Sequence, residues 1–383
     1  MAIIGIDVTA LSTPSSGGIG TSQYQTMLAL ARLDTPHEFI MYAAAPPVVP
    51  FSERPLDVPW RLRLGHGPFT RSNIVWMQTG VNPLLAQDGV DLFWSPRHVL
   101  PFRARGIKRV ATLQDFWHLH FPGQQPLLNR TANRILIDRI LRVSDHIVCA
   151  SQATADDAIA RSSRVRERIT IVPLGVDVAT FRRLDEPSIA ATLERLGVRG
   201  DYLLSLDVFN PRKNFANVVR AFSALPAEER RGLSLVGIGR RRETAADVGP
   251  REIAAAHGVA DALVLLDDVS FDDLVALYSG ALALVYPSVY EGFGMPVLEA
   301  MACGCPVVTS DRSSLPEVAG DTALLVDPES PEAIAGAIRI LATEPTRRSG
   351  LVVAGLERAS AFTWERTATE MLDVFDRVLA RAR

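Results

Sequence analysis

Two glutamates, Glu291 and Glu299, lie in the short stretch SVYEGFGMPVLEAMACGCPVV. A carboxylate can accept two hydrogen bonds from a vicinal diol, such as the 2′- and 3′-hydroxyls of a ribose. Glu299 could bind a ribose in this way, and Glu291 could bind hydroxyls of a second sugar ring. One nucleotide-sugar could then bind to both glutamates. The alternative is that Glu299 complements a helix dipole and that Glu291 is a solvated loop charge.

The residues between the two glutamates predict a loop that leads into a helix. Gly292 and Gly294 permit unusual backbone angles and the close approach of a ligand. Pro296 suits the first position of a helix, so we expect Glu299 in the first helical turn. The free amides and the dipole at the start of this helix would favour an anion.

Two further loops offer groups for an anion. FNPRKN places the forked guanidinium of Arg212 beside the compact ammonium of Lys213, which suits phosphate oxygens, although a solvated surface pair is the alternative. In PSSGGIGTSQYQ, Gly18 and Gly20 would let backbone amides approach an anion or a sugar, or would form a tight turn between a strand and a helix. Gln23 stands where a dinucleotide fingerprint needs glycine, so nicotinamide binding is not favoured.

Strands and helices alternate along the chain in a way that would position these loops. Apolar strands such as AIIGIDV, EFIMYA and HIVCAS alternate with helical patterns, and the series restarts with YLLSLD, FANVVRAFSAL and LSLVGI. This pattern predicts an α/β fold with two Rossmann-like, doubly wound domains that face each other across a cleft. We place the domains at residues 1–186 and 187–363, followed by an amphipathic helix at 364–383 that could pack on either one.

Composition narrows the class of protein. The chain has 383 residues, of which 48% are hydrophobic, and these can fill two cores. A net charge of −3 gives no basic field for nucleic acid, so we expect no nucleic-acid partner. Three cysteines form neither a disulfide framework nor a spaced zinc set. The start lacks a charged region before its apolar residues, and no apolar run is long enough for a membrane span, so we expect a cytoplasmic protein.

Taken together, these residues resemble a known family. The segment YEGFGMPVLEAMACGCPVVTSDRSSLPEVAGDTALLVDP is similar to the signature of the retaining glycosyltransferases of family four, which have the GT-B fold and use nucleotide-sugars. GGIG, LFWSPRHVLP, ATLQDFWHLHFP, SDHIVCASQATADD, ITIVPLGVD, YLLSLDVFNPRKN, LVGIGR and FTWERTATEMLDVF match the family's blocks in their usual order. Within the family, the chain most resembles bacterial mannosyltransferase-like enzymes that build polysaccharide or O-antigen chains of lipopolysaccharide.

The resemblance implies a role for each motif. Glu291 would contact the transferred sugar, Glu299 would bind the ribose, and Arg212 with Lys213 would neutralise the diphosphate. The N-terminal domain would bind the acceptor, the C-terminal domain would bind the nucleotide-sugar, and the last helix would cross back to the first domain. The other implied donor-binding residues are Gly18, Gly20, Gly292, Phe293, Gly294, Met295 and Pro296.

The block LQDFWHLHFP departs from the family's pattern. The family commonly has a histidine where this chain has Gln114, followed by Asp115, and we place both in the predicted catalytic set. Gln114 can hydrogen-bond a sugar hydroxyl on the acceptor side but cannot shuttle a proton. His118 is a nearby acceptor-side candidate. In the second domain, Asp207 replaces a glycine of many relatives and would repel a diphosphate unless it were paired, for example with Arg212.

The implied reaction moves a hexose, with mannose from GDP-mannose as the leading candidate, to a glycan or a lipid-linked oligosaccharide with retention at the anomeric carbon. No D-x-D pair occurs in the sequence, so we expect neither a metal ion nor a cofactor besides the nucleotide-sugar co-substrate. The segment PLLNRTANRILIDRILRV could lie against anionic lipid on the inner face of the cytoplasmic membrane, or could be an ordinary amphipathic helix. A nucleotide-sugar epimerase of the same fold and a non-catalytic homologue that acts as an assembly partner are the alternatives.

Overall fold

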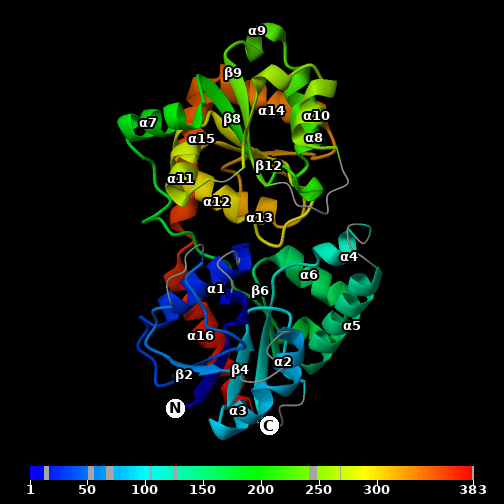
Figure 1. The fold of residues 1–383 in the computed structure, drawn as a ribbon, viewed down its shortest axis with the longest axis vertical. Helices are drawn as coiled ribbons and strands as arrows, with labels where there is room; N and C mark the ends of the chain where they lie inside the picture. The colour runs from blue at the N-terminus through cyan, green and yellow to red at the C-terminus, as the bar shows by residue number, and fades with distance from the viewer. Residues whose placement is uncertain are drawn as a thin grey trace. The chain divides into compact units, whose positions relative to one another are not determined.

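The computed structural model describes residues 1–12, 17–50, 56–65, 73–102, 106–121, 123, 127–240, 248–267 and 269–381. The chain forms two compact units, of which the first comprises Met1–Gly175 with Thr363–Arg383 and the second comprises Val176–Phe362. Each unit has one parallel sheet with helices packed on it (Figure 1). The predicted α/β class with two doubly wound sheets is therefore confirmed.

The described part of the first unit contains a seven-stranded sheet in the order β3-β2-β1-β4-β5-β6-β7. Neighbouring strands are parallel, and Ile4 on the central strand β1 pairs with Phe39 on one side and Leu92 on the other. The strand order therefore reverses beside β1, as in a doubly wound fold. The strands are β1 (Ile3–Asp7), β2 (Glu38–Ala43), β3 (Arg61–Leu64), β4 (Leu92–Ser95), β5 (Lys108–Leu113), β6 (His146–Cys149) and β7 (Ile169–Ile171).

The C-terminal helix α16 completes the first unit. It packs against α1, its Thr367 hydroxyl donates to the carbonyl of Pro173 at 2.8 Å, and its Phe375 ring lies 5.7 Å from that of Trp94 on β4. Buried residues recur every three or four positions along it, as expected for a helix with one face on a sheet. The helices of this unit are α1 (Gly17–Leu30), α2 (Asn73–Thr79), α3 (Val81–Gln87), α4 (Trp117–His120), α5 (Leu127–Val143), α6 (Gln152–Arg161) and α16 (Trp364–Ala380), with 3₁₀ turns η1 (Thr9–Leu11) and η4 (Ser163–Arg168).

The described part of the second unit contains a six-stranded parallel sheet in the order β10-β9-β8-β11-β12-β13. The strands are β8 (Asp201–Leu206), β9 (Leu233–Ile238), β10 (Leu263–Leu266), β11 (Ala283–Tyr286), β12 (Val307–Ser310) and β13 (Leu324–Val326). The helices are α7 (Glu186–Leu196), α8 (Phe215–Ala224), α9 (Ala227–Arg230), α10 (Pro250–Ala256), α11 (Phe271–Gly280), α12 (Met295–Ala302), α13 (Leu315–Ala319), α14 (Pro331–Thr343) and α15 (Pro345–Ser360), with 3₁₀ turns η5 (Pro211–Lys213) and η6 (Ala260–Ala262).

Helices α8 and α14 pack together over one face of this second sheet (Figure 1). Phe215, Val218, Val219 and Phe222 are buried at the spacing of one helical face, so α8 contributes a continuous apolar stripe to the core. Among the described residues of both units, no helix combines the length and the apolar character that a membrane crossing requires.

The second unit begins at Val176, before the predicted boundary at residue 187. The ring of Phe181 lies 6.4 Å from Phe271 and 6.3 Å from Tyr278, both on α11. The amide of Leu184 donates to Ser279 Oγ at 3.2 Å. The residues just before the predicted boundary therefore pack onto the second unit, because Phe181 and Leu184 contact α11.

Candidate active site

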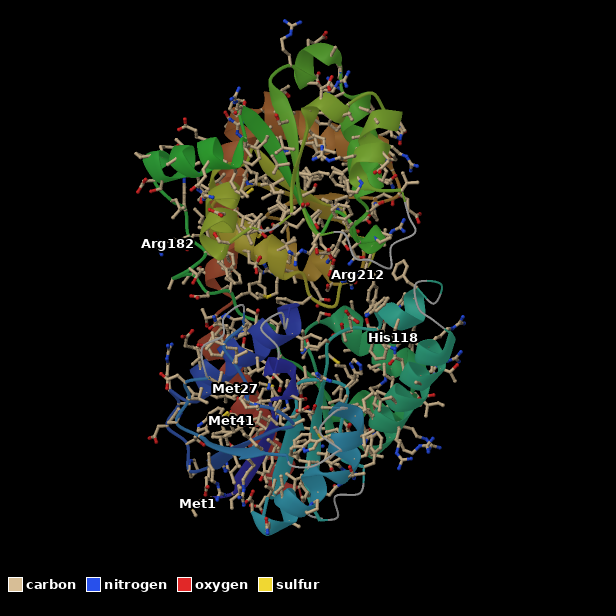
Figure 2. The ribbon with its side chains drawn as sticks, in the orientation of Figure 1. Met1, Met27, Met41, His118, Arg182 and Arg212 are labelled. Atoms are coloured by element: carbon tan, nitrogen blue, oxygen red, sulfur yellow. The ribbon has the colours of Figure 1, made fainter. Side chains whose placement is uncertain are left out.

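Two loops of the second unit meet at the carboxyl ends of neighbouring strands. Strands β8 and β11 are adjacent and parallel, so the loops that follow them lie at the same edge of the sheet. The amide of Val289 and the hydroxyl of Ser288 both donate to the carbonyl of Arg212, at 3.0 and 3.1 Å. These hydrogen bonds bring Arg212 and Lys213 from the first loop to Glu291 in the second; Figure 2 labels Arg212.

Lys213, Glu291 and Tyr286 form a closed cluster of hydrogen bonds. Lys213 Nζ lies 2.5 Å from Glu291 Oε1 and also donates to the Tyr286 hydroxyl. The Tyr286 hydroxyl lies 2.9 Å from the same Oε1, while Arg212 Nη2 lies 3.9 Å from Oε2. The side chains of Lys213 and Glu291 are only 10% and 9% exposed, so this is a largely buried ion pair.

The charges around Glu291 decide its protonation. Burial would raise the pKa of Glu291, but the positive charges of Lys213 and Arg212 outweigh burial and hold that pKa below its ordinary value. Burial raises the pKa of Tyr286 well above its ordinary value, so its hydroxyl keeps its proton and can donate a hydrogen bond to the carboxylate. Glu291 is therefore a charged acceptor at neutral pH.

Two serines hold the backbone of the loop that contains Glu291. The amide of Glu291 donates to Ser313 Oγ at 3.0 Å. The Ser314 hydroxyl lies 2.9 Å from the carbonyl of Glu291 and 2.6 Å from that of Phe293. These contacts fix the path of the loop from Glu291 to Phe293, which the sequence analysis assigned to the donor.

Helix α12 starts one residue earlier than predicted. Gly294 precedes it with a φ of 121°, a backbone conformation that L side chains rarely adopt, and Met295 is the first helical residue. Pro296 occupies the second position, so the prediction that it begins the helix is wrong by one residue. The prediction that Glu299 lies in the first turn is wrong as well, since no acidic residue does.

Glu299 has surroundings unlike those of Glu291. Its Oε2 accepts a hydrogen bond from the hydroxyl of Tyr278 at 3.1 Å. Burial raises the pKa of Glu299 to about 7, and the hydrogen bond from Tyr278 offsets this only in part. Of the two glutamates, Glu291 is thus held charged, and Glu299 titrates near neutral pH.

Asp207 shapes the loop that carries the two cations. It adopts a φ of 52° at the end of β8, and its Oδ2 accepts from Asn210 Nδ2 at 2.8 Å. Asn210 Oδ1 in turn accepts from the amide of Arg212 at 3.2 Å. The Asp207 carboxylate thus receives a hydrogen bond from Asn210, and this chain of contacts leads to the backbone of Arg212.

In the first unit, Gly18 and Gly20 lie in the first turn of α1 and not in a loop before it. The helix begins at Gly17, so the prediction of a glycine-rich loop at these positions is wrong. Gly18 is exposed, and, apart from its chain neighbours and its own helix backbone, no atom of the described residues lies within 4 Å of the position that a Cβ would take, whereas Gly20 is buried. The start of a helix after β1 is nevertheless where the sequence placed it.

Gln114 and Asp115 follow β5, and their side chains form hydrogen bonds with nearby backbone groups of the first unit. Gln114 Nε2 donates to the carbonyl of Pro96 at 2.9 Å, which fixes the orientation of its amide. Asp115 Oδ1 accepts from the amide of Trp117 at 3.2 Å and so helps to start α4. Both side chains are half-buried.

His118 lies on α4 and is buried (Figure 2). Its ring stacks on those of Phe116 and His98, with centroids 6.3 and 6.4 Å apart. Burial lowers the pKa of His118, so its imidazole is neutral at pH 7, and its Nε2 has no hydrogen-bond partner among the described residues. Within those same ranges, no three His, Cys, Asp or Glu side chains are grouped so that they could hold a metal ion.

Sequence reasoning missed four residues that support the two glutamates. Tyr286 and Tyr278 each donate to one carboxylate, and Ser313 and Ser314 hold the loop. A signal existed for Tyr286, because it is a polar-tipped residue at the end of an otherwise apolar strand, directly before the loop. The side chain of Tyr278 lies in a buried helix pattern, which gives no sign of its partner.

Comparison with known proteins finds glycosyltransferase matches in both halves of the chain. The family described as "Glycosyl transferases group 1" matches residues 195–357, and "Glycosyltransferase Family 4" matches residues 16–180. Both matches are to glycosyltransferases, and each covers less than half of the chain. The chain is 37% identical over 175 residues to the O-antigen chain mannosyltransferase B of Escherichia coli, which is 45% of each chain. The chain thus spans about half the length of this curated relative.

Solved structures share the architecture of this chain. Sucrose-phosphate synthase from Thermosynechococcus elongatus superposes with a TM-score of 0.78 at 21% identity, over the whole of both chains. Anabaena HepE in complex with UDP-glucose gives a TM-score of 0.75 at 15% identity, over 98% of this chain and 100% of that one. At these identities the likeness concerns the fold, and it confirms the predicted GT-B architecture.

Proposed function

We propose that this chain transfers a hexose from a nucleotide-sugar to a hydroxyl of a glycan or a lipid-linked oligosaccharide, with retention at the anomeric carbon. The observation that supports this most directly is the cluster of Arg212, Lys213 and Glu291 at the ends of β8 and β11. Two cations beside one charged acceptor suit a ligand that combines a diphosphate with a sugar.

Each group in the cluster has a contact to offer the donor. Lys213 uses two of its three N–H donors on Glu291 and Tyr286 within the described residues, which leaves one for a phosphate oxygen. Glu291 Oε1 is taken by Lys213 and Tyr286, so Oε2 is the oxygen that would accept from a sugar hydroxyl. Glu299 would accept from the ribose diol.

The proposed step exchanges one bond at the anomeric carbon. The bond from that carbon to the diphosphate oxygen breaks, and a bond to the acceptor oxygen forms on the same face of the sugar. The acceptor's proton goes to the departing phosphate oxygen. Arg212 and Lys213, with the amides of Phe293, Gly294 and Met295, would stabilise the negative charge on the diphosphate, so the scheme needs no metal ion.

We propose GDP-mannose as the donor and cell-surface polysaccharide synthesis as the context. The matched relative from Escherichia coli is an O-antigen chain mannosyltransferase, and the similar HepE structure is a complex with UDP-glucose. The test is a thermal-shift panel of GDP-mannose, UDP-glucose, UDP-N-acetylglucosamine and dTDP-rhamnose, followed by product analysis with and without added glycan acceptors. A selective rise in Tm with transfer to an acceptor is expected. Absence of any shift and of any product would overturn the proposal, and an epimerised sugar formed without acceptor would indicate an epimerase.

We also propose that the protein works in the cytoplasm and touches the inner face of the membrane through α5. This helix carries Arg130, Arg134, Arg139 and Arg142, and its Ile135 is 63% exposed. Basic side chains beside an exposed apolar one suit anionic lipid headgroups.

Vesicle flotation tests the membrane contact. The protein should float with anionic vesicles and not with neutral ones, and Arg134→Glu with Arg142→Glu should abolish flotation. The matched control is Arg220→Glu with Arg251→Glu, which makes the same charge change on exposed positions of the second unit. An equal loss of flotation in both double variants would show that the net charge of the protein, and not α5, is responsible for vesicle binding.

A further inference from the structure

We propose that Tyr286 is a positioning residue that holds Lys213 and Glu291 in one arrangement before the donor binds. The inference rests on the proposed function, since it concerns the same cluster. Tyr286 is the last residue of β11 and is 1% exposed, so its ring is fixed by the core around it. Its carbonyl also accepts from the hydroxyl of Thr309 on the neighbouring strand β12, at 2.9 Å.

The hydrogen bonds of the Tyr286 hydroxyl have one consistent assignment. An ammonium can only donate, so the phenol oxygen accepts from Lys213, and its single proton goes to Glu291 Oε1. Lys213 Nζ also lies 4.9 Å from the centroid of the Tyr286 ring, within reach of a cation–π attraction. Both partners of the ion pair are therefore tied to the same immobile side chain.

An ion pair alone does not fix the place of its members. Lys213 has a long flexible stem, and an ammonium can approach a carboxylate from many directions. The Tyr286 oxygen is held at a fixed position and binds both Lys213 Nζ and Glu291 Oε1. The third N–H of Lys213 and the Oε2 of Glu291 therefore point in set directions before the donor binds. A displacement of about 1 Å in such groups can lower turnover by about a hundredfold.

The variant Tyr286→Phe keeps the ring and removes the hydroxyl. Because the Tyr286 hydroxyl positions Lys213 and Glu291 and does not itself contact the donor, we expect kcat for nucleotide release from GDP-mannose to fall about tenfold. The KM for GDP-mannose should change less than about twofold. Tyr202→Phe is the matched control. Tyr202 is fully buried on the adjacent strand β8, and its hydroxyl donates to the carbonyl of Leu277 at 2.7 Å.

Each variant removes a buried tyrosine hydroxyl with its hydrogen bonds, so both should lower Tm, while kcat should fall in Tyr286→Phe alone. Equal kcat values for the two variants would overturn the inference. If the wild-type protein releases nucleotide from none of the nucleotide-sugars tested, the proposed function is wrong. That result would not bear on the positioning role of Tyr286.

A second measurement tests the positioning role without any activity. In a double-mutant cycle of Tyr286→Phe and Lys213→Met, the losses of stability should be non-additive, because the Tyr286 hydroxyl acts through Lys213. Strict additivity in the ligand-free protein would overturn the inference, whatever reaction the protein catalyses.

Discussion

Replacing Glu299 by Gln should stabilise the protein more at alkaline than at acidic pH. In the folded protein burial raises the pKa of this carboxyl to about 7, compared with 4.5 for a free glutamate. Between these two values the folded state binds more protons than the unfolded state, so the wild-type stability falls as pH rises through this window. The difference between the two pKa values corresponds to about 3 kcal/mol at pH 8. Glutamine carries no charge to bury and still accepts from Tyr278.

Urea unfolding followed by tryptophan fluorescence measures this effect. The stabilisation by Glu299→Gln should grow from about 1 kcal/mol at pH 5 to about 3 kcal/mol at pH 8. Burial raises the pKa of the neighbouring groups Tyr278 and Cys303, so both keep their protons throughout this range. Glu357→Gln, at an exposed position of α15 in the same unit, is the control and should show no such trend.

Donor binding should change with pH in the opposite direction. A diol donates to the ionised carboxylate, so the affinity for GDP-mannose in calorimetric titration should rise about tenfold from pH 6 to pH 8 in the wild type. Glu299→Gln should bind weakly, with no such dependence. An equal gain in stability for the variant at pH 5 and pH 8 would show that the pKa of this carboxyl is not raised in the folded protein.

Two further substitutions probe the same unit. Lys213→Ala should lower kcat for nucleotide release by about one to two decades with a smaller change in KM, because a hydrogen bond to the departing diphosphate contributes roughly 1.5–3 kcal/mol; a rise in KM alone would contradict this. Gly294→Ala should lower stability by about 1–3 kcal/mol, since φ is 121° and the new Cβ would lie 2.8 Å from Leu315 Cδ2. Gly336→Ala is its control in thermal unfolding. Gly336 lies within α14, and outside its own helix backbone no atom of the described residues lies within 4 Å of the new Cβ, so alanine should stabilise the protein slightly.

The sequence was sufficient for the fold because its signals are local and repeated. Alternating apolar strands and helical patterns fixed both doubly wound sheets, and glycines with a proline marked the start of α12 to within one residue. The N-terminal boundary of the second unit could not be predicted in this way. Phe181 stands in a polar stretch, and its packing on α11 is a contact between residues far apart in the chain.

The site was predictable in its residue types but not in its pairings. The sequence contains a guanidinium, an ammonium and one carboxylate in two loops, with a second carboxylate in the helix that follows, and it does not state that Lys213 meets Glu291. That contact follows from the adjacency of β8 and β11 in the sheet, and strand order is a property of the whole unit. The different charge states of Glu291 and Glu299 depend on burial and on which carboxylate lies near a cation, which only coordinates provide.

The return of α16 to the first unit has a consequence for biosynthesis. That unit is assembled from two separate segments, and the second unit is one continuous segment inserted between them. During translation, the second unit can fold as soon as Phe362 has left the ribosome, while the first sheet still lacks the helix that covers Trp94. The N-terminal unit is therefore completed last, and a nascent chain halted before Thr363 would present an uncovered apolar face to chaperones.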